Sequence, residues 1–110
     1  MIPHRPPMLF PVADGRVSLP LAHPLAVEGW FSPVALIECA AQLAGREVVA
    51  EPGHAGMLVE IGEFVAQVDR VAAGESLAYR VTLERTMGPL WRFRVELVGI
   101  LTVAVTIRVG

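Results

Sequence analysis

The sequence predicts an α+β fold in which a curved antiparallel β-sheet wraps around one long central α-helix. The chain has 110 residues, 54% of them hydrophobic, which is enough to build a single core without disulfides or metals. One run, residues 34–50, is apolar on nearly every side, as expected of a helix that other elements surround. Four segments with strand patterns follow it. We therefore expect one domain spanning residues 1–110.

The N-terminal part of the chain is predicted to be extended. Three prolines precede residue 8 and disfavour a helix over residues 1–13. Asp14-Gly15 is a turn signal, and a short strand over residues 16–21 follows it. Residues 22–31 are expected to form a loop.

Ser32 and Pro33 mark the start of the predicted helix. A serine side chain can cap the first backbone N–H groups, and proline suits the first helical position because its missing N–H would be unpaired there anyway. The helix is expected to run through residue 50 and to end before Pro52-Gly53.

Four strands are predicted after the helix, over residues 57–68, 76–86, 90–98 and 100–109. Apolar and polar residues alternate along the last three, so each has one face suited to a core. The connections at Ala73-Gly74, Met87-Gly88-Pro89 and Gly99 are short, which predicts an antiparallel meander. Edges of such a sheet are often closed by a second copy of the chain.

Charge and composition exclude several classes of function. The net charge of −2 is spread along the chain, which disfavours binding to nucleic acid or to an anionic membrane. All nine basic residues are arginine, so lysine Schiff-base chemistry, pyridoxal phosphate attachment and a P-loop lysine are excluded within this chain. The single Cys39 and three widely spaced histidines disfavour a metal site, and we expect no cofactor. Without a signal-peptide pattern or a run of about 20 apolar residues, the protein is expected to be cytoplasmic.

Two polar residues stand out in HPLAVEGWFSPVALIECAAQ, residues 23–42. His23 and Glu38 could form an acid–base pair, but each also has a simpler interpretation. A loop histidine is often solvated or hydrogen-bonded, and Glu38 could share a polar helix face with Gln42 and Arg46. Burying a lone carboxylate costs on the order of several kcal/mol, so a glutamate in a helix this apolar favours the functional interpretation.

The order of these motifs resembles a known enzyme family. The opening IPHRPPMLF, the HP loop, the SPVALIECAAQLAG helix and the last three strands are together similar to the hotdog-fold β-hydroxyacyl-(acyl carrier protein) dehydratases. The PHRPPM form looks most like the small dehydratase-like proteins of aryl-polyene and polyketide clusters. This resemblance implies a hotdog fold, a dimer with one continuous sheet, and a 3-hydroxyacyl substrate on the phosphopantetheine arm of a carrier protein or coenzyme A.

The resemblance also implies roles for individual residues. His23 of one chain would take the α-proton and face Glu38 of the other, which would help the hydroxyl leave as water. Pro33 occupies the position of the family's carbonyl-binding glycine and has no N–H, so the carbonyl donor would be Val34 or another residue, or would be missing. Gly29 would supply the backbone freedom that the loop glycine supplies in the family. We therefore expect Gly29, Pro33 and Val34 to contact the substrate.

Two alternatives stay open: an acyl thioesterase of the same fold, and a non-catalytic dehydratase-like subunit that pairs with another chain. Weaker candidate residues have simpler expected roles. His4 is expected to make a structural hydrogen bond, His54 to be an exposed turn residue, and Cys39 to be a small core residue. The aromatic residues could line an acyl tunnel, but at these spacings they more often belong to the core or to a dimer interface; they are Trp30, Phe31 and Trp91.

Overall fold

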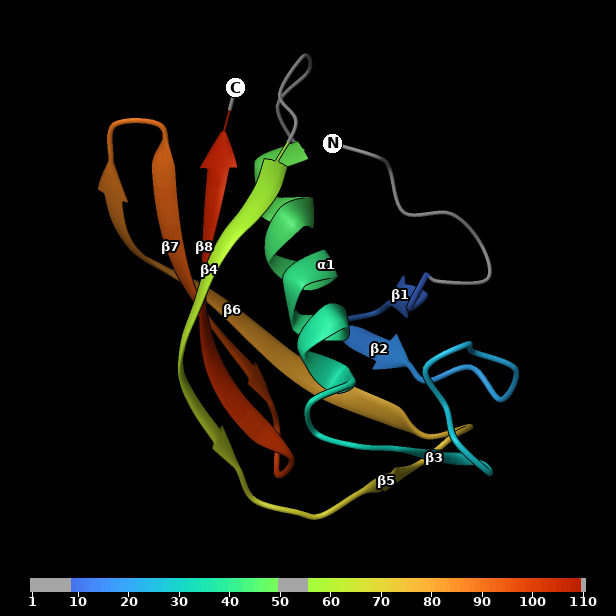
Figure 1. Ribbon diagram of the computed structural model, residues 1–110. Helices are drawn as coiled ribbons and strands as arrows, with labels where there is room; N and C mark the ends of the chain where they lie inside the picture. The colour runs from blue at the N-terminus through green and yellow to red at the C-terminus, as the bar shows by residue number, and fades with distance from the viewer. Residues whose placement is uncertain (1–8, 50–55, 110) are drawn as a thin grey trace.

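The computed structural model describes residues 9–49 and 56–109, which form one helix and two antiparallel sheets (Figure 1). The helix is α1 (Leu36–Val49). The larger sheet has six strands in the order β1-β2-β6-β7-β8-β4, and the smaller pairs β3 with β5. The strands are β1 (Val12–Ala13), β2 (Arg16–Ser18), β3 (Trp30–Phe31), β4 (Gly56–Ala66), β5 (Val71–Ala72), β6 (Ser76–Met87), β7 (Leu90–Leu97) and β8 (Leu101–Val109).

The core lies between α1 and one face of the six-stranded sheet. The helix packs against β8, β4 and β7; in Figure 1 it stands beside these strands, and β6 passes behind it. Alternate residues of β7 and β8 point toward it, and all are nearly inaccessible: Phe93, Val95, Leu97, Leu101, Val103, Val105 and Ile107. Leu36, Cys39, Ala40, Leu43, Ala44 and Val48 supply the helix side.

The start of the helix follows the capping pattern of the sequence. The Ser32 hydroxyl accepts a 3.1 Å hydrogen bond from the Ala35 N–H, three residues on, as an N-cap side chain does. The Ser32 carbonyl accepts a second 3.1 Å bond from Leu36. The predicted N-cap is confirmed, although regular α-helix begins at Leu36 and a turn precedes it.

The last three strands of the predicted meander, β6-β7-β8, are confirmed, but its first strand is not next to β6: β4 pairs with β8, and β2 lies beside β6. The Asp14-Gly15 turn is also confirmed, with φ of 53° and 72°, the left-handed pair that a two-residue hairpin needs. Predicted alternation fails at Leu83, which is 47% exposed because α1 covers β7, β8 and β4 but not this end of β6.

Three predicted boundaries were wrong. The strand expected over residues 16–21 ends at Ser18, just before Pro20, which cannot donate to a ladder. The expected loop over residues 22–31 contains β3, which pairs with the unpredicted β5 through Trp30↔Ala72 and Phe31↔Val71. The first predicted strand of the meander, residues 57–68, is β4 and ends at Ala66.

Some predictions fall outside the described residues, namely those for His4 with the PHRPPM segment and for His54. Within residues 9–49 and 56–109, no helix is long and apolar enough to cross a membrane. In the same part of the chain, no three His, Cys, Asp or Glu side chains are placed to share a metal ion.

Candidate functional site

His23 is buried, with 3% of its surface exposed, inside an aromatic group of the N-terminal loop region. Its ring stacks on Phe10 with centroids 4.1 Å apart and lies 5.5 Å from the ring of Phe31. Both phenylalanines belong to the core. The solvated interpretation of His23 is therefore wrong, and its ring is held in a defined orientation.

A local backbone bond sets the hydrogen positions on this ring. The Leu25 N–H donates a 3.1 Å hydrogen bond to Nδ1 of His23, and the His23 carbonyl accepts a 3.0 Å bond from Ala26. A neutral imidazole has one donor and one acceptor nitrogen. Since Nδ1 accepts, the hydrogen of the neutral ring is on Nε2.

Glu38 lies in the first turn of α1 and is half-buried. Its Oε1 accepts a 3.3 Å hydrogen bond from Nε2 of Gln42, one helical turn later. Arg46, the third residue of the expected polar face, is exposed in the last turn. The predicted polar helix face is confirmed for Glu38 and Gln42, which are hydrogen-bonded to each other. This contact is compatible with a catalytic role for Glu38, so that interpretation stays open.

Phe10 connects the two candidate residues within one chain. Its backbone N–H donates a 3.0 Å hydrogen bond to Oε1 of Gln42, while its ring carries the stack on His23. Gln42 in turn holds Glu38. The structure therefore brings His23, Phe10, Gln42 and Glu38 into one neighbourhood. The predicted approach of His23 to Glu38 of a second chain stays a prediction.

The residues at the start of α1 leave one backbone donor open. Pro33 has no N–H, and the N–H groups of Ala35 and Leu36 are bound by Ser32. Among the described residues, none accepts a hydrogen bond from the Val34 amide. Val34 is one of the positions that the family resemblance left open for a carbonyl donor, and its side chain is 69% exposed.

Gly29 occupies a tight turn with a clear backbone role. Glu28 and Gly29 have φ of 51° and 82°, and Val27 and Trp30 exchange two hydrogen bonds around them. A side chain at residue 29 would meet nothing within 4 Å, so the positive φ is what favours glycine there. The Gly29 carbonyl accepts a 2.8 Å bond from Ala73, next to β5. Substrate contact by Gly29 stays a prediction.

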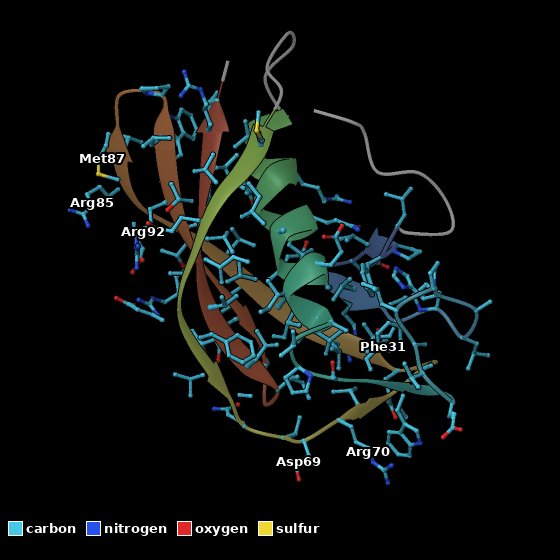
Figure 2. All side chains as sticks on the ribbon, in the orientation of Figure 1. Phe31, Asp69, Arg70, Arg85, Met87 and Arg92 are labelled. Atoms are coloured by element: carbon cyan, nitrogen blue, oxygen red, sulfur yellow. The ribbon has the colours of Figure 1, made fainter. Side chains whose placement is uncertain are left out.

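The aromatic candidates divide between core and surface. Phe31 is fully buried, whereas Trp30, its neighbour on β3, is 38% exposed and lies under the Arg70 guanidinium at 3.8 Å. In Figure 2, Arg70 projects outward at the edge of the molecule. Trp91 is half-buried beside Phe93, with ring centroids 6.4 Å apart. Phe31 is a core residue.

Cys39 is a core residue, as the sequence suggests. It is inaccessible to solvent on the inner side of α1. Burial, and to a lesser extent the charge of Glu38, raises the pKa of its thiol to about 12. A thiol in this state is a poor nucleophile.

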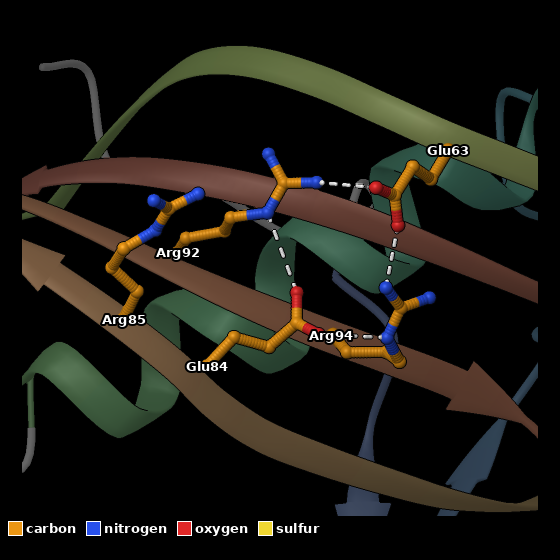
Figure 3. Close-up of a pocket in the computed structure, with 5 residues that line it drawn as sticks. All are labelled: Glu63, Glu84, Arg85, Arg92 and Arg94. Carbon is orange, nitrogen blue, oxygen red and sulfur yellow. Dashed lines mark hydrogen bonds and ion pairs between the residues drawn. The ribbon is translucent and has the colours of Figure 1, made fainter.

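A second polar cluster lies on the outer face of the sheet, opposite α1. Arg92 and Arg94 of β7 point outward and share two carboxylates from the flanking strands (Figure 3). Arg92 lies 3.3 Å from each of Glu63 and Glu84, and Arg94 lies 3.0 Å from Glu84 and also bonds Glu63. Together with Arg85 these residues line an open hollow of about 540 Å³.

Two β-bulges build this outer-face cluster. The register shifts between Gly62 and Val65 on β4 and between Leu83 and Arg85 on β6, and Glu63 has a φ of 47°. The hydrogen bond from Arg94, followed by the charges of Arg92 and Arg94, lowers the pKa of Glu63. Both Glu63 and Glu84 are shared between two arginines, so we interpret the cluster as a structural ion-pair network.

Sequence alternation places Arg92 and Arg94 on one polar face of their strand, but it missed Glu63, because a bulge changes the side to which a residue points. It also missed Phe10 and the Leu25 amide near His23. Nothing in the sequence marks either residue as functional, because Phe10 contributes the face of its ring and Leu25 contributes a backbone N–H.

The sequence matches no model of a known protein family and no curated protein.

Proposed function

We propose that this protein is a hotdog-fold, dehydratase-like enzyme that removes water from a 3-hydroxyacyl thioester carried on acyl carrier protein or coenzyme A, in fatty-acid or polyketide-type biosynthesis. One observation carries the proposal. Within each chain, Phe10 stacks on His23 and is hydrogen-bonded to Gln42, which in turn holds Glu38, so both candidate residues are fixed in position and His23 could face Glu38 of a second chain.

The arrangement of the elements supports the hotdog part of this proposal. A single long helix lies on one face of a six-stranded antiparallel sheet, and the strand order places β4 and β1 at its two ends. This order is compatible with a hotdog fold, in which the helix is the central element and the sheet curves around it.

The chemistry of dehydration supports the choice of residues. Removing a weakly acidic α-proton and expelling a hydroxyl requires acid–base groups and a donor at the thioester carbonyl. His23 and Glu38 are the titratable residues of the neighbourhood described above, and the open amide of Val34 is a donor at the start of α1. These groups need no metal or organic cofactor.

The exposed edge of the sheet supports a dimer. Strand β4 ends the six-stranded sheet and, over its 11 residues, spans roughly 36 Å at the usual rise per residue. Four of its apolar side chains are more than 40% exposed, namely Met57, Val59, Ile61 and Val65. A long apolar edge strand is an aggregation hazard unless it is paired. We propose that β4 pairs with β4 of a second copy, or with a dehydratase-like partner chain.

The test is to identify the product formed from a 3-hydroxyacyl-loaded carrier protein. Mass spectrometry of the intact carrier separates water loss, which gives the enoyl thioester, from hydrolysis, which gives the free carrier arm and a carboxylic acid. We expect the enoyl product from the wild type, strongly reduced product from Glu38→Gln, and unchanged product from Glu47→Gln, an exposed glutamate of the same helix.

The two alternatives give different results in the same assay. Release of a free acid would replace the dehydratase with a thioesterase. No reaction with the chain alone, together with reaction in the presence of a co-purifying dehydratase-like partner, would assign this chain the role of a non-catalytic subunit.

A further inference from the structure

We propose that Arg92 and Arg94 neutralise the acidic edge strand β4, and that this neutralisation allows β4 to pair antiparallel with β4 of a second copy of the chain. The inference rests on the dimer that accompanies the proposed function, and it names the charges that decide the partner. The residues that carry it belong to the outer-face cluster.

The Arg92 side chain crosses the sheet from β7 to the edge strand. Arg92 pairs in register with Thr106 of β8, and Thr106 pairs with Glu60 of β4, so the three residues form one row on the outer face. The guanidinium lies beside Gly62, because a Cβ added there would be 3.8 Å from Nη2 of Arg92. The absence of a side chain at Gly62 therefore leaves room for the guanidinium on β4 itself.

At the edge strand, Arg92 holds two carboxylates. Its Nη1 lies 3.6 Å from Glu60, and its Nη2 lies 3.3 Å from Glu63. Arg94 also bonds Glu63, as Figure 3 shows. The side chains of Glu60 and Glu63 are 65% and 59% exposed, whereas that of Arg92 is only 17% exposed. A mostly covered cation thus holds two exposed anions on the outer face.

Pairing of two β4 strands over their full length would bring these anions together. Ile61 is the middle residue of Gly56–Ala66, so the two-fold axis of such a pair passes through it. Glu60 precedes Ile61 by one residue and Glu63 follows it by two. With strands about 4.8 Å apart and a rise of about 3.4 Å per residue, Glu60 of one copy lies roughly 6 Å from Glu63 of the other, measured between Cα atoms. Like charges this close oppose strand pairing.

The outer-face cluster removes this obstacle. Arg92 binds the same two glutamates that would face each other across the axis. Three arginines and three glutamates make up the cluster with Glu60 included, so its charges balance: Arg85, Arg92, Arg94, Glu60, Glu63 and Glu84. The four exposed apolar side chains of β4 are then left to form the contact.

The balance of charge also selects the kind of partner. Charged residues on an edge strand normally prevent pairing, and a partner with a basic strand would complement an acidic edge. Here the carboxylates of Glu60 and Glu63 are already bound by arginine within the chain, so a basic strand gains little from them. A second copy of this chain, whose edge is neutralised in the same way, is the partner that fits.

The test measures the dissociation constant of the dimer by analytical ultracentrifugation. In about 0.1 M NaCl we expect Arg92→Gln to weaken association at least tenfold, because Glu60 and Glu63 lose their counter-charge. A variant that also carries Glu60→Gln and Glu63→Gln should regain wild-type association. Arg80→Gln is the matched control, since Arg80 lies 3.8 Å from Glu96 on β6 and β7, away from the edge strand. It should leave association unchanged.

Salt separates a charge effect from damage to the fold. Raising NaCl from about 0.1 M to about 1 M shortens the Debye length from about 10 Å to about 3 Å, so Arg92→Gln should approach wild-type association in high salt. Arg94→Gln is a second variant, with a side chain that is 38% exposed in the wild type, and it should weaken association in the same direction. Both variants should keep the wild-type circular dichroism spectrum.

Three results would overturn the inference. The first is wild-type association in Arg92→Gln. The second is a triple variant that stays as weak as Arg92→Gln. The third is association stronger than wild type when Glu60→Gln and Glu63→Gln are introduced alone, because the carboxylates would then oppose pairing in spite of the arginines.

The failure of this inference and that of the proposed function are distinguishable, because ultracentrifugation needs no substrate. A wild type that forms the enoyl product but stays monomeric, or dimerises without the expected response to these variants, would overturn the inference and leave the dehydratase. A wild type that dimerises with the expected response but forms no enoyl product would overturn the dehydratase alone.

Discussion

The side-chain oxygen of Gln42 accepts a 3.0 Å hydrogen bond from the backbone N–H of Phe10, 32 residues earlier in the chain. The bond fixes the segment before β1 to the middle of α1. Because Gln42 also holds Glu38 and Phe10 also stacks on His23, this one amide positions both candidate catalytic residues.

Gln42→Leu should therefore affect activity more than stability. The lost hydrogen bond is expected to lower the free energy of unfolding by about 1–2 kcal/mol, measured by urea denaturation. We expect kcat for dehydration to fall at least tenfold, because Glu38 and the Phe10–His23 stack lose their common support. Arg46→Leu, one helical turn later and exposed, is the matched control and should keep kcat near the wild-type value. Equal effects of the two variants on kcat would contradict the positioning role.

The thiol of Cys39 should be unreactive in the folded protein. With a pKa of about 12, only roughly one thiol in ten thousand is ionised at pH 8, and the side chain is inaccessible. Labelling by iodoacetamide, followed by mass spectrometry, is expected to be undetectable without denaturant and to rise steeply through the urea transition. Rapid labelling of native protein would show that the inner side of α1 is open to solvent.

The Glu63 network should make stability depend on pH in the acidic range. Interactions with Arg94 and Arg92 lower the pKa of Glu63 in the folded state. A carboxyl group whose pKa is lowered by folding stabilises the protein above its unfolded pKa, near 4.5, and this contribution is lost as the pH falls through the folded pKa.

Comparing urea midpoints at pH 6 and pH 3 tests this dependence. The difference between the two midpoints should be smaller in Glu63→Gln than in the wild type. Glu47→Gln removes an exposed carboxylate on the helix and should keep the wild-type difference. Identical pH dependence in the wild type and Glu63→Gln would show that the network adds no stability.

The β4 edge predicts how the proposed dimer can be dissociated. A lysine at Ile61, in the middle of β4, places a charge beside the pairing strand, and we expect Ile61→Lys to weaken association at least a hundredfold by analytical ultracentrifugation. Val98→Lys is the control, because Val98 has nearly the same exposure, 43% against 42%, but lies in the turn between β7 and β8. Dissociation by both variants, or by neither, would place the interface elsewhere.

Local signals in the sequence predicted most of the secondary structure. The Ser32-Pro33 pair and the apolar run after it identified α1, and period-two alternation identified β6, β7 and β8. Such features depend on residues within a few positions of each other. The pairing of β3 with β5 was missed, because each strand is two residues long and its partner lies about 40 residues away in the chain.

The candidate site was predicted only in part, for a similar reason. His23 and Glu38 could be selected because polar residues in an apolar run are unusual. Phe10 could not, since its contribution depends on a backbone N–H and a ring face that meet distant residues only after folding. The tautomer of His23 likewise depends on a backbone bond that no residue type specifies.

The central claim is that His23 and Glu38 serve one catalytic site, built by two chains. The most direct test mixes His23→Ala and Glu38→Gln proteins after co-refolding and measures enoyl formation from a 3-hydroxyacyl-loaded carrier protein. A mixed dimer contains one site with both residues intact, so the account predicts that the mixture recovers up to about a quarter of wild-type activity, well above either variant alone. A mixture that stays at the level of the separate variants, with an active wild type, would contradict a site shared between chains.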